Sequence, residues 1–297
     1  MDCKTFLNKY GMYYLMLLPL VFCLFIFSYL PMTGILYAFT NYSPFKFDID
    51  FVGVENFKNL FANKGFWQAF KNTLEISTTR LLITTFGSIG LALLLDEIRS
   101  LRFRKLAQTV VYIPHFMSWV IVASIFTMIL SPKTGFVNSI IDGLGGERVY
   151  FLANKDWWRP CLYMISSWKE VGWGAIIYVS ALAGVDMEQH EAATMDGANR
   201  LQRVWHITLP AISNTIVVVF ILNLAKILNL FEPVWVLQNS MVIGVSDVIE
   251  TYVYRMGITG SQYGISTAAG LFKSVISVGF VLIANKLSKK MTGEEVI

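Results

Sequence analysis

The chain has 297 residues, of which 55% are hydrophobic and only 15% are charged. Soluble domains carry about 25% charged residues, so this composition indicates a protein whose solvent is lipid. The net charge of +4 is small and scattered, without a basic run, which argues against nucleic acid as a partner. The cysteines show no Cys-x-x-Cys spacing and no nearby histidine, so the sequence predicts neither a disulfide nor a metal site.

Several apolar segments are long enough to cross a bilayer, since one crossing takes roughly 20 residues. Six spans are predicted, at residues 12–39, 73–95, 109–130, 160–184, 211–237 and 265–287. The first span follows basic residues as a signal peptide would, but its apolar run is too long for a signal core, so we expect it to remain as an anchor. The fold class is therefore an all-α polytopic membrane protein with six transmembrane helices, forming one membrane domain over residues 1–297.

Basic residues give the predicted orientation, because Lys and Arg accumulate in cytoplasmic loops. With six spans, one side of the membrane receives the following basic residues: Lys4, Lys9, Arg99, Arg102, Arg104, Lys105, Arg200, Arg203, Lys286, Lys289 and Lys290. The sequence therefore predicts that the N- and C-termini are both cytoplasmic. Trp67, Trp157 and Trp158 would lie at the outer interface, where tryptophan commonly anchors a span.

The polar loop at residues 185–210, between spans four and five, contains signals for two short helices. Asp186 is a helix-capping residue and predicts a helix over residues 187–196. Gly197 permits a left-handed turn, and a second helix is expected over residues 198–206 before Pro210. Such a loop forms a rigid projection that a soluble partner can bind, although an ordinary amphipathic connector would carry similar signals.

The same loop matches the pattern E-A-A-x3-G-x9-I-x-L-P. The small side chains of Ala192 and Ala193 would let a partner approach the helix backbone, and Glu191 offers a carboxylate for pairing. The candidate coupling residues are Glu191, Ala192, Ala193, Asp196, Gly197, Ile207, Leu209 and Pro210.

This pattern resembles the cytoplasmic coupling motif of permease subunits of binding-protein-dependent ABC importers. Nearly the whole chain is similar to the polysaccharide and oligosaccharide permeases of that family (LplB-like, maltose-type). The resemblance is carried by F-S-Y-L-P-M (27–32), V-G-V-E-N-F (52–57), P-H-F-M-S-W (114–119), W-K-E-V-G-W (168–173), D-V-I-E-T-Y-V-Y-R (247–255) and G-L-F-K-S (270–274).

The resemblance implies a type I permease fold in the plasma membrane of a bacterium. It implies a second homologous permease subunit, two ATPase subunits seated on the coupling loop, and an extracytoplasmic solute-binding lipoprotein that delivers oligosaccharides. The chain itself has no G-x4-G-K-[ST] phosphate-binding loop, so we expect no enzyme activity and no catalytic residue in it. The cofactors ATP and Mg²⁺ would be bound by the partner ATPase.

Spans four to six carry polar residues that are costly at membrane depth and therefore suggest a substrate pathway. Amides and aromatic rings are the groups that bind sugars. The candidates are Lys169, Glu170, Asn223, Lys226, Asn229, Glu232, Trp235, Gln238 and Lys273. The alternative is pairing between helices, such as Lys226 with Glu170 or Glu232. His115 is interpreted as a structural residue near the cytoplasmic interface.

The surplus of deep lysines, with Arg80 in span two, favours an acidic oligosaccharide containing uronic or sialic acid. Two other classes of membrane protein are alternatives to an importer permease. An ion-gradient-driven secondary transporter of small polar solutes should show inverted repeats, and none is evident. A polytopic glycosyltransferase would need clustered acidic residues at a membrane face, which the sequence lacks.

Overall fold

The computed structural model describes the backbone of residues 3–44 and 48–292. The side chains of residues 3–9, 287 and 290–292 lie outside this description, and with them three of the orienting lysines, Lys4, Lys9 and Lys290. The described residues form helices joined by loops, with one isolated antiparallel bridge between Thr40 and Phe51. The predicted all-helical class is therefore confirmed.

The chain divides into two compact units, which are Met1–Asn63 with Val253–Leu271 and Lys64–Tyr252 with Phe272–Ile297. Unit 1 contains α1 (Cys3–Leu24), the π-helical turn η1 (Phe25–Tyr29), the 3-10 helix η2 (Leu30–Phe39), α2 (Glu55–Ala62) and a second π-helical turn, η5 (Arg255–Thr259). Asn56 holds this unit together, because its amide donates to the carbonyls of Ala38, at 3.0 Å, and Thr40, at 2.9 Å. The V-G-V-E-N-F motif is thus structural.

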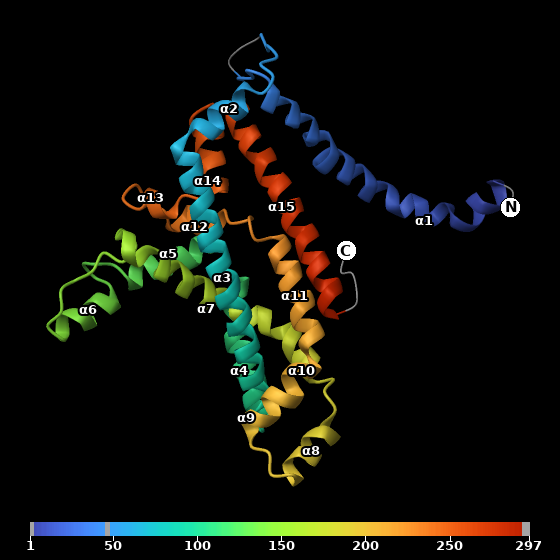
Figure 1. The fold of residues 1–297 in the computed structure, drawn as a ribbon, viewed down its shortest axis with the longest axis vertical. Helices are drawn as coiled ribbons and strands as arrows, with labels where there is room; N and C mark the ends of the chain where they lie inside the picture. Colours follow the sequence, from blue (N-terminus) through green and yellow to red (C-terminus); the bar gives the residue numbers. More distant parts are fainter. Residues whose placement is uncertain (1–2, 45–47, 293–297) are drawn as a thin grey trace. The chain divides into compact units, whose positions relative to one another are not determined.

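Unit 2 is built on the long helices α3 (Lys64–Asp96) and α7 (Lys155–Leu182), which pack along each other. Its other elements are α4 (Leu101–Tyr112), η3 (Ile113–Phe116), α5 (Trp119–Ile129), α6 (Phe136–Gly143), α8 (Met187–Met195), α9 (Arg200–Arg203), η4 (Val204–Thr208), α10 (Leu209–Ala211), α11 (Ser213–Ala225), α12 (Glu232–Leu237) and α13 (Ile243–Ser246). The chain passes between the two units within α14 (Ile249–Tyr254) and α15 (Tyr263–Thr292). Within unit 2, α8 and α9 lie at the end where α3 finishes (Figure 1).

Among the residues that the structure describes, three helices are long and apolar enough to cross a membrane, at Tyr10–Phe39, Lys64–Asp96 and Tyr263–Lys286. Within the same residues, two further helix pairs meet this criterion but are sharply bent, and each is a candidate for one broken span. Helix α7 occupies the predicted fourth span but is not among the candidates, because Lys169 and Glu170 lie in its middle. The predicted six spans remain an expectation.

Spans three and five were wrongly predicted as continuous helices. The third bends by 103° between Leu101–Phe116 and Trp119–Ile129, where Ser118 caps the new helix by accepting from the Ile121 amide. In the fifth, α11 ends at Ala225 and α12 starts only at Glu232. Pro233 lies in the first turn of α12, where its missing amide hydrogen costs no helical hydrogen bond, so it favours the start of this second helix.

The tryptophans at the start of α7 differ in environment. Trp158 is fully buried, and its indole donates to the Leu237 carbonyl at 3.0 Å. The prediction of an interface anchor was therefore wrong for Trp158, because tertiary packing supplies a partner for its N–H inside the protein. Trp67 and Trp157 are about half exposed and remain compatible with anchoring.

Glycines allow α7 to pack very closely against its neighbours. A Cβ atom placed on Gly172 would lie 1.9 Å from the Val111 carbonyl oxygen of α4, and one on Gly174 would lie 2.4 Å from the Ser88 hydroxyl of α3. Since the first contact is with backbone, a side-chain rotation cannot relieve it. Close packing of this kind is common where small residues join membrane helices.

Substituting Gly172→Ala should therefore destabilise the chain by about 1–3 kcal/mol through overpacking. Gly90→Ala in α3 is the matched control, because a Cβ there meets no atom within 4 Å and alanine favours the helix. Thermal unfolding of the two variants in detergent measures the difference. Equal melting temperatures would show that α4 and α7 are not in this close contact.

Candidate functional site

The coupling segment, which is the predicted coupling loop at residues 185–210, begins with α8, whose ends are set by local contacts. Asp186 caps the helix by accepting from the Glu188 amide at 2.9 Å, as the sequence predicted. At the other end, Gly197 has φ +84°, the Gly197 amide donates to Thr194 and the Ala198 amide donates to Ala193. These two bonds form a Schellman motif, which requires a residue in the left-handed region after the helix. The predicted turn at Gly197 is confirmed.

The second helix of the segment differs from the prediction. Asn199 starts α9 and forms a capping box with Gln202, which the sequence analysis missed. The helical path then continues through η4 and α10 to residue 211, and the chain bends by 63° before α11. Pro210 thus lies inside this path, near its end, and α11 starts after the bend.

Internal contacts connect the coupling segment to the end of α3 and connect its two helices to each other. Arg200 pairs with Glu97 after the end of α3 at 3.2 Å, and Arg203 donates to the Thr194 hydroxyl at 2.7 Å. Glu191, Ala192 and Asp196 are exposed, and none of the described side chains forms an ion pair with Glu191. These three pattern residues therefore face the exterior of this chain, whereas Ala193 and Ile207 are half-buried and Leu209 packs against the buried side chains of unit 2.

Large apolar side chains are exposed on the same segment, which sequence reasoning did not single out. They are Met187, Met195, Leu201 and Trp205, each at least 65% exposed. Apolar side chains gathered in a polar loop mark a protein or membrane contact. Their signal was present in the sequence as apolar residues in short polar helices.

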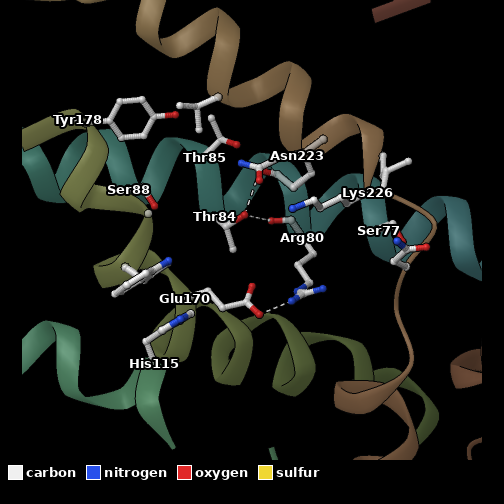
Figure 2. Close-up of a pocket in the computed structure, with 16 residues that line it drawn as sticks. Ser77, Arg80, Thr84, Thr85, Ser88, His115, Glu170, Tyr178, Asn223 and Lys226 are labelled. Carbon is white, nitrogen blue, oxygen red and sulfur yellow. Dashed lines mark hydrogen bonds and ion pairs between the residues drawn. The ribbon is translucent and has the colours of Figure 1, made fainter. Parts of the chain in front are cut away.

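A second site is a cavity of about 330 Å³ in unit 2, formed by α3, α7, α11 and the residue His115 of η3 (Figure 2). Polar side chains from α3 and α11 face one another across it. The polar lining residues are Ser77, Arg80, Thr84, Thr85, Ser88, His115, Glu170, Tyr178, Asn223, Lys226 and Asn229. A polar cavity within membrane-crossing helices is costly and indicates a function.

Several buried polar atoms of this lining have no hydrogen-bond partner among the described residues. They are Ser77 Oγ, Arg80 Nε, Thr85 Oγ1, His115 Nδ1 and Tyr178 Oη. Buried polar atoms are nearly always paired, so their convergence on one cavity indicates a place for water or for a ligand rich in hydroxyl groups. Trp173 adds an aromatic face and stacks on the His115 ring at a centroid distance of 4.2 Å.

Charges in the cavity are partly neutralised. Arg80 on α3 and Glu170 on α7 form an ion pair, in which the guanidinium donates to the carboxylate (Figure 2). This pairing differs from the alternative predicted for Glu170, which was Lys226. Lys226 forms no ion pair within the described part of the chain.

Lys169 is placed differently from its neighbour Glu170. It is 6% exposed, and its ammonium donates to the carbonyls of His115 and Met117, each at 2.7 Å. The ammonium also lies 5.6 Å from the centroid of the Trp119 ring. These contacts hold the bend of the third span against α7, so Lys169 has a structural role in this geometry.

The other candidate pathway residues are distributed over unit 2. Asn223, Lys226 and Asn229 line the cavity with Glu170, whereas Glu232 is exposed at the start of α12. Trp235 lines a separate open hollow between α5 and α12, and Gln238 donates to Asp247. Lys273 of α15 pairs with Glu250 of α14.

Sequence reasoning missed the serine and threonine residues of α3 that line the cavity. Ser77, Thr84 and Ser88 recur on one face of α3 at helical spacing, and this polar stripe in an apolar span was a usable signal. The bend of the predicted third span brings His115, which was interpreted as a structural residue, into the cavity wall.

Comparison with known proteins identifies the family. Residues 87–293 match the family described as the binding-protein-dependent transport system inner membrane component. The chain belongs to this family of importer permeases. It is 46% identical to protein LplB of Bacillus subtilis, with 95% of this chain and 89% of that protein aligned. It is 44% identical to the B. subtilis polygalacturonan/rhamnogalacturonan transport system permease protein YteP, over 95% and 88% of the two chains.

Solved structures agree with this assignment. A chain of the bacterial alginate ABC transporter, crystallised with an alginate pentasaccharide-bound periplasmic protein, superposes on this importer permease with a TM-score of 0.91. The two chains are 38% identical, and the match covers 99% of this chain and 100% of the other. A chain from a second structure of a bacterial ABC transporter that imports alginate matches with a TM-score of 0.89 and 40% identity, over 96% of this chain and 98% of that one. The ABC importer permease fold is thus shown.

Substituting Lys169→Met should destabilise the permease by about 2–4 kcal/mol, because two partly buried carbonyls lose their charged donor. Lys226→Met is the control, since Lys226 is exposed and should change stability by less than about 0.5 kcal/mol. Melting temperatures of both variants in detergent distinguish the two lysines. An unchanged melting temperature in Lys169→Met would contradict the structural role of Lys169.

Proposed function

We propose that this permease moves oligosaccharides, with a preference for acidic ones, into the bacterial cytoplasm. It would act with a second homologous permease, two ATPase subunits and an extracytoplasmic solute-binding lipoprotein. The chain would cross the plasma membrane six times, with both termini and the coupling segment in the cytoplasm. The observation that carries the proposal is the polar cavity between α3, α7 and α11, with its unpaired polar atoms and aromatic wall.

The residue types in the cavity support a sugar as the cargo. Hydroxyl and amide groups such as Thr84 and Asn223 can bond to sugar hydroxyls, and the ring of Trp173 can cover the apolar face of a pyranose. Lys226 supports an acidic sugar, because it is the one cation of the lining without an ion pair among the described residues. The names of two relatives, a polygalacturonan/rhamnogalacturonan permease and an alginate importer, point to the same substrate class.

The exposed coupling segment supports energy input from a partner. Glu191, Ala192 and Ala193 lie on a short helix whose end is fixed by Gly197, beside exposed apolar side chains. A rigid helix that contacts two states of a partner differently can shift the permease between two packings. ATP and Mg²⁺ would bind in the ATPase subunits, and this chain would hold no cofactor. The alternative, a secondary transporter driven by an ion gradient, gains no support from the family match.

Gly197→Ala should abolish most coupling between ATP hydrolysis and uptake, because alanine disfavours the left-handed conformation that ends α8. Gly145→Ala is the matched control, since Gly145 has φ +80° and is likewise free of neighbouring atoms. Each substitution should cost about 1 kcal/mol of stability, but only Gly197→Ala should lower substrate-stimulated ATPase activity, by at least about tenfold.

A cysteine at Met195, in a variant without the natural cysteines, tests the orientation. It should react with a membrane-impermeant maleimide only in inside-out vesicles. Labelling of Met195→Cys in intact cells would contradict the cytoplasmic placement of the coupling segment.

In the separate coupling experiment, normal coupling in Gly197→Ala would contradict the docking role of the coupling segment.

Substrate preference is measured by competition in proteoliposomes that contain the whole importer. Trigalacturonate should reduce uptake of a labelled acidic oligosaccharide at least about tenfold more effectively than its fully methyl-esterified form, because the ester offers no carboxylate to Lys226. Equal competition by the two sugars would remove the acidic preference while leaving oligosaccharide import intact.

A further inference from the structure

The charged lining of the cavity is small enough to consider group by group. Arg80 and Lys226 supply two positive charges, and Glu170 supplies one negative charge. His115, from η3, is the other titratable group with basic character in the lining. Because Arg80 and Glu170 are paired, Lys226 is the cation of the lining whose charge no described carboxylate neutralises.

The guanidinium of Arg80 is only partly used by this pair. One of its terminal nitrogens donates to Glu170, while Nε is buried without a partner among the described residues. Both side chains are partly buried, with 20% of Arg80 and 27% of Glu170 exposed. Arg80 therefore lines the cavity with only the exposed fifth of its side chain, its buried Nε is out of reach of a ligand, and Glu170 neutralises its charge.

A transport site must bind its cargo strongly enough to admit it and weakly enough to release it. Two free cations facing an acidic sugar would hold its carboxylates by two charge-assisted contacts. Glu170 prevents the contact between Arg80 and the sugar, because its own carboxylate is already paired with the Arg80 guanidinium. Removing Glu170 would therefore strengthen binding, whereas removing Arg80 would leave an unpaired carboxylate in the path of an anion.

We propose that Glu170 is a specificity-determining residue that limits how tightly an acidic oligosaccharide is held. The Glu170 carboxylate neutralises the charge of Arg80. Lys226 therefore attracts the sugar carboxylate, while Arg80 binds anions only weakly. This inference rests on the proposed transport of acidic oligosaccharides. It assigns attraction of the sugar to Lys226 and limitation of its binding to Glu170.

A double-mutant cycle on the complete importer in proteoliposomes tests the proposal, with ATP-driven uptake of trigalacturonate as the readout. Glu170→Gln should lower both KM and the maximal rate, by roughly 3- to 10-fold, because the freed Arg80 retains the sugar. Arg80→Gln should reduce uptake at least about tenfold, because unpaired Glu170 repels the anion.

The double variant Arg80→Gln with Glu170→Gln provides the decisive comparison. It restores a single positive charge in the cavity, so its KM and maximal rate should return to within about threefold of the wild type. Lys226→Gln should raise KM for trigalacturonate without lowering the melting temperature. Melting temperatures of all variants separate loss of folding from loss of transport.

Three results would overturn the inference. These are an unchanged or raised KM in Glu170→Gln, a double variant as impaired as Arg80→Gln alone, and an unchanged KM in Lys226→Gln. Each would show that the pair is structural or that the cavity charge does not act on the sugar. Failure of the proposed function would look different, since the wild-type importer would then take up neither trigalacturonate nor its ester.

Discussion

The hydrogen bonds from the Lys169 ammonium to two backbone carbonyls are the interaction on which the cavity depends. A bend of 103° in the third span leaves the carbonyls of His115 and Met117 without helical partners, and Lys169 supplies the donor for both. An unpaired carbonyl at membrane depth costs several kcal/mol, so the bend persists only where a donor reaches it. The bend in turn places His115 in the cavity wall against Trp173.

Close backbone packing by glycine works together with this lysine. Gly172 lets α7 approach the backbone of α4, and three residues earlier Lys169 bonds to the bend that follows α4. The motifs P-H-F-M-S-W and W-K-E-V-G-W therefore contact each other in the folded chain. These contacts explain why a lysine and a glycine occur in the middle of α7, the predicted fourth span.

The ionisable residues of the membrane helices fall into different roles once their partners are known. Lys273 is neutralised by Glu250, Lys169 by carbonyl dipoles and Arg80 by Glu170. Lys226 is the one candidate lysine of the pathway without such a partner in the described part of the chain. The apparent surplus of deep positive charge in the sequence thus reduces to a single side chain at the cavity. Charge count alone could not give this result, because it ignores which groups meet.

The sequence by itself determined the lipid environment, the helical class and the ends of α8. These depend on composition and on contacts between residues a few positions apart, such as the cap at Asp186 and the left-handed turn at Gly197. The bend after Phe116, the break between α11 and α12, and the burial of Trp158 were decided by the tertiary structure. For the bend and for Trp158, a partner distant in sequence satisfies a polar group that lipid could not: Lys169 donates to the two carbonyls at the bend, and the Leu237 carbonyl accepts from the Trp158 indole. Periodicity along a single segment carries no information about that partner.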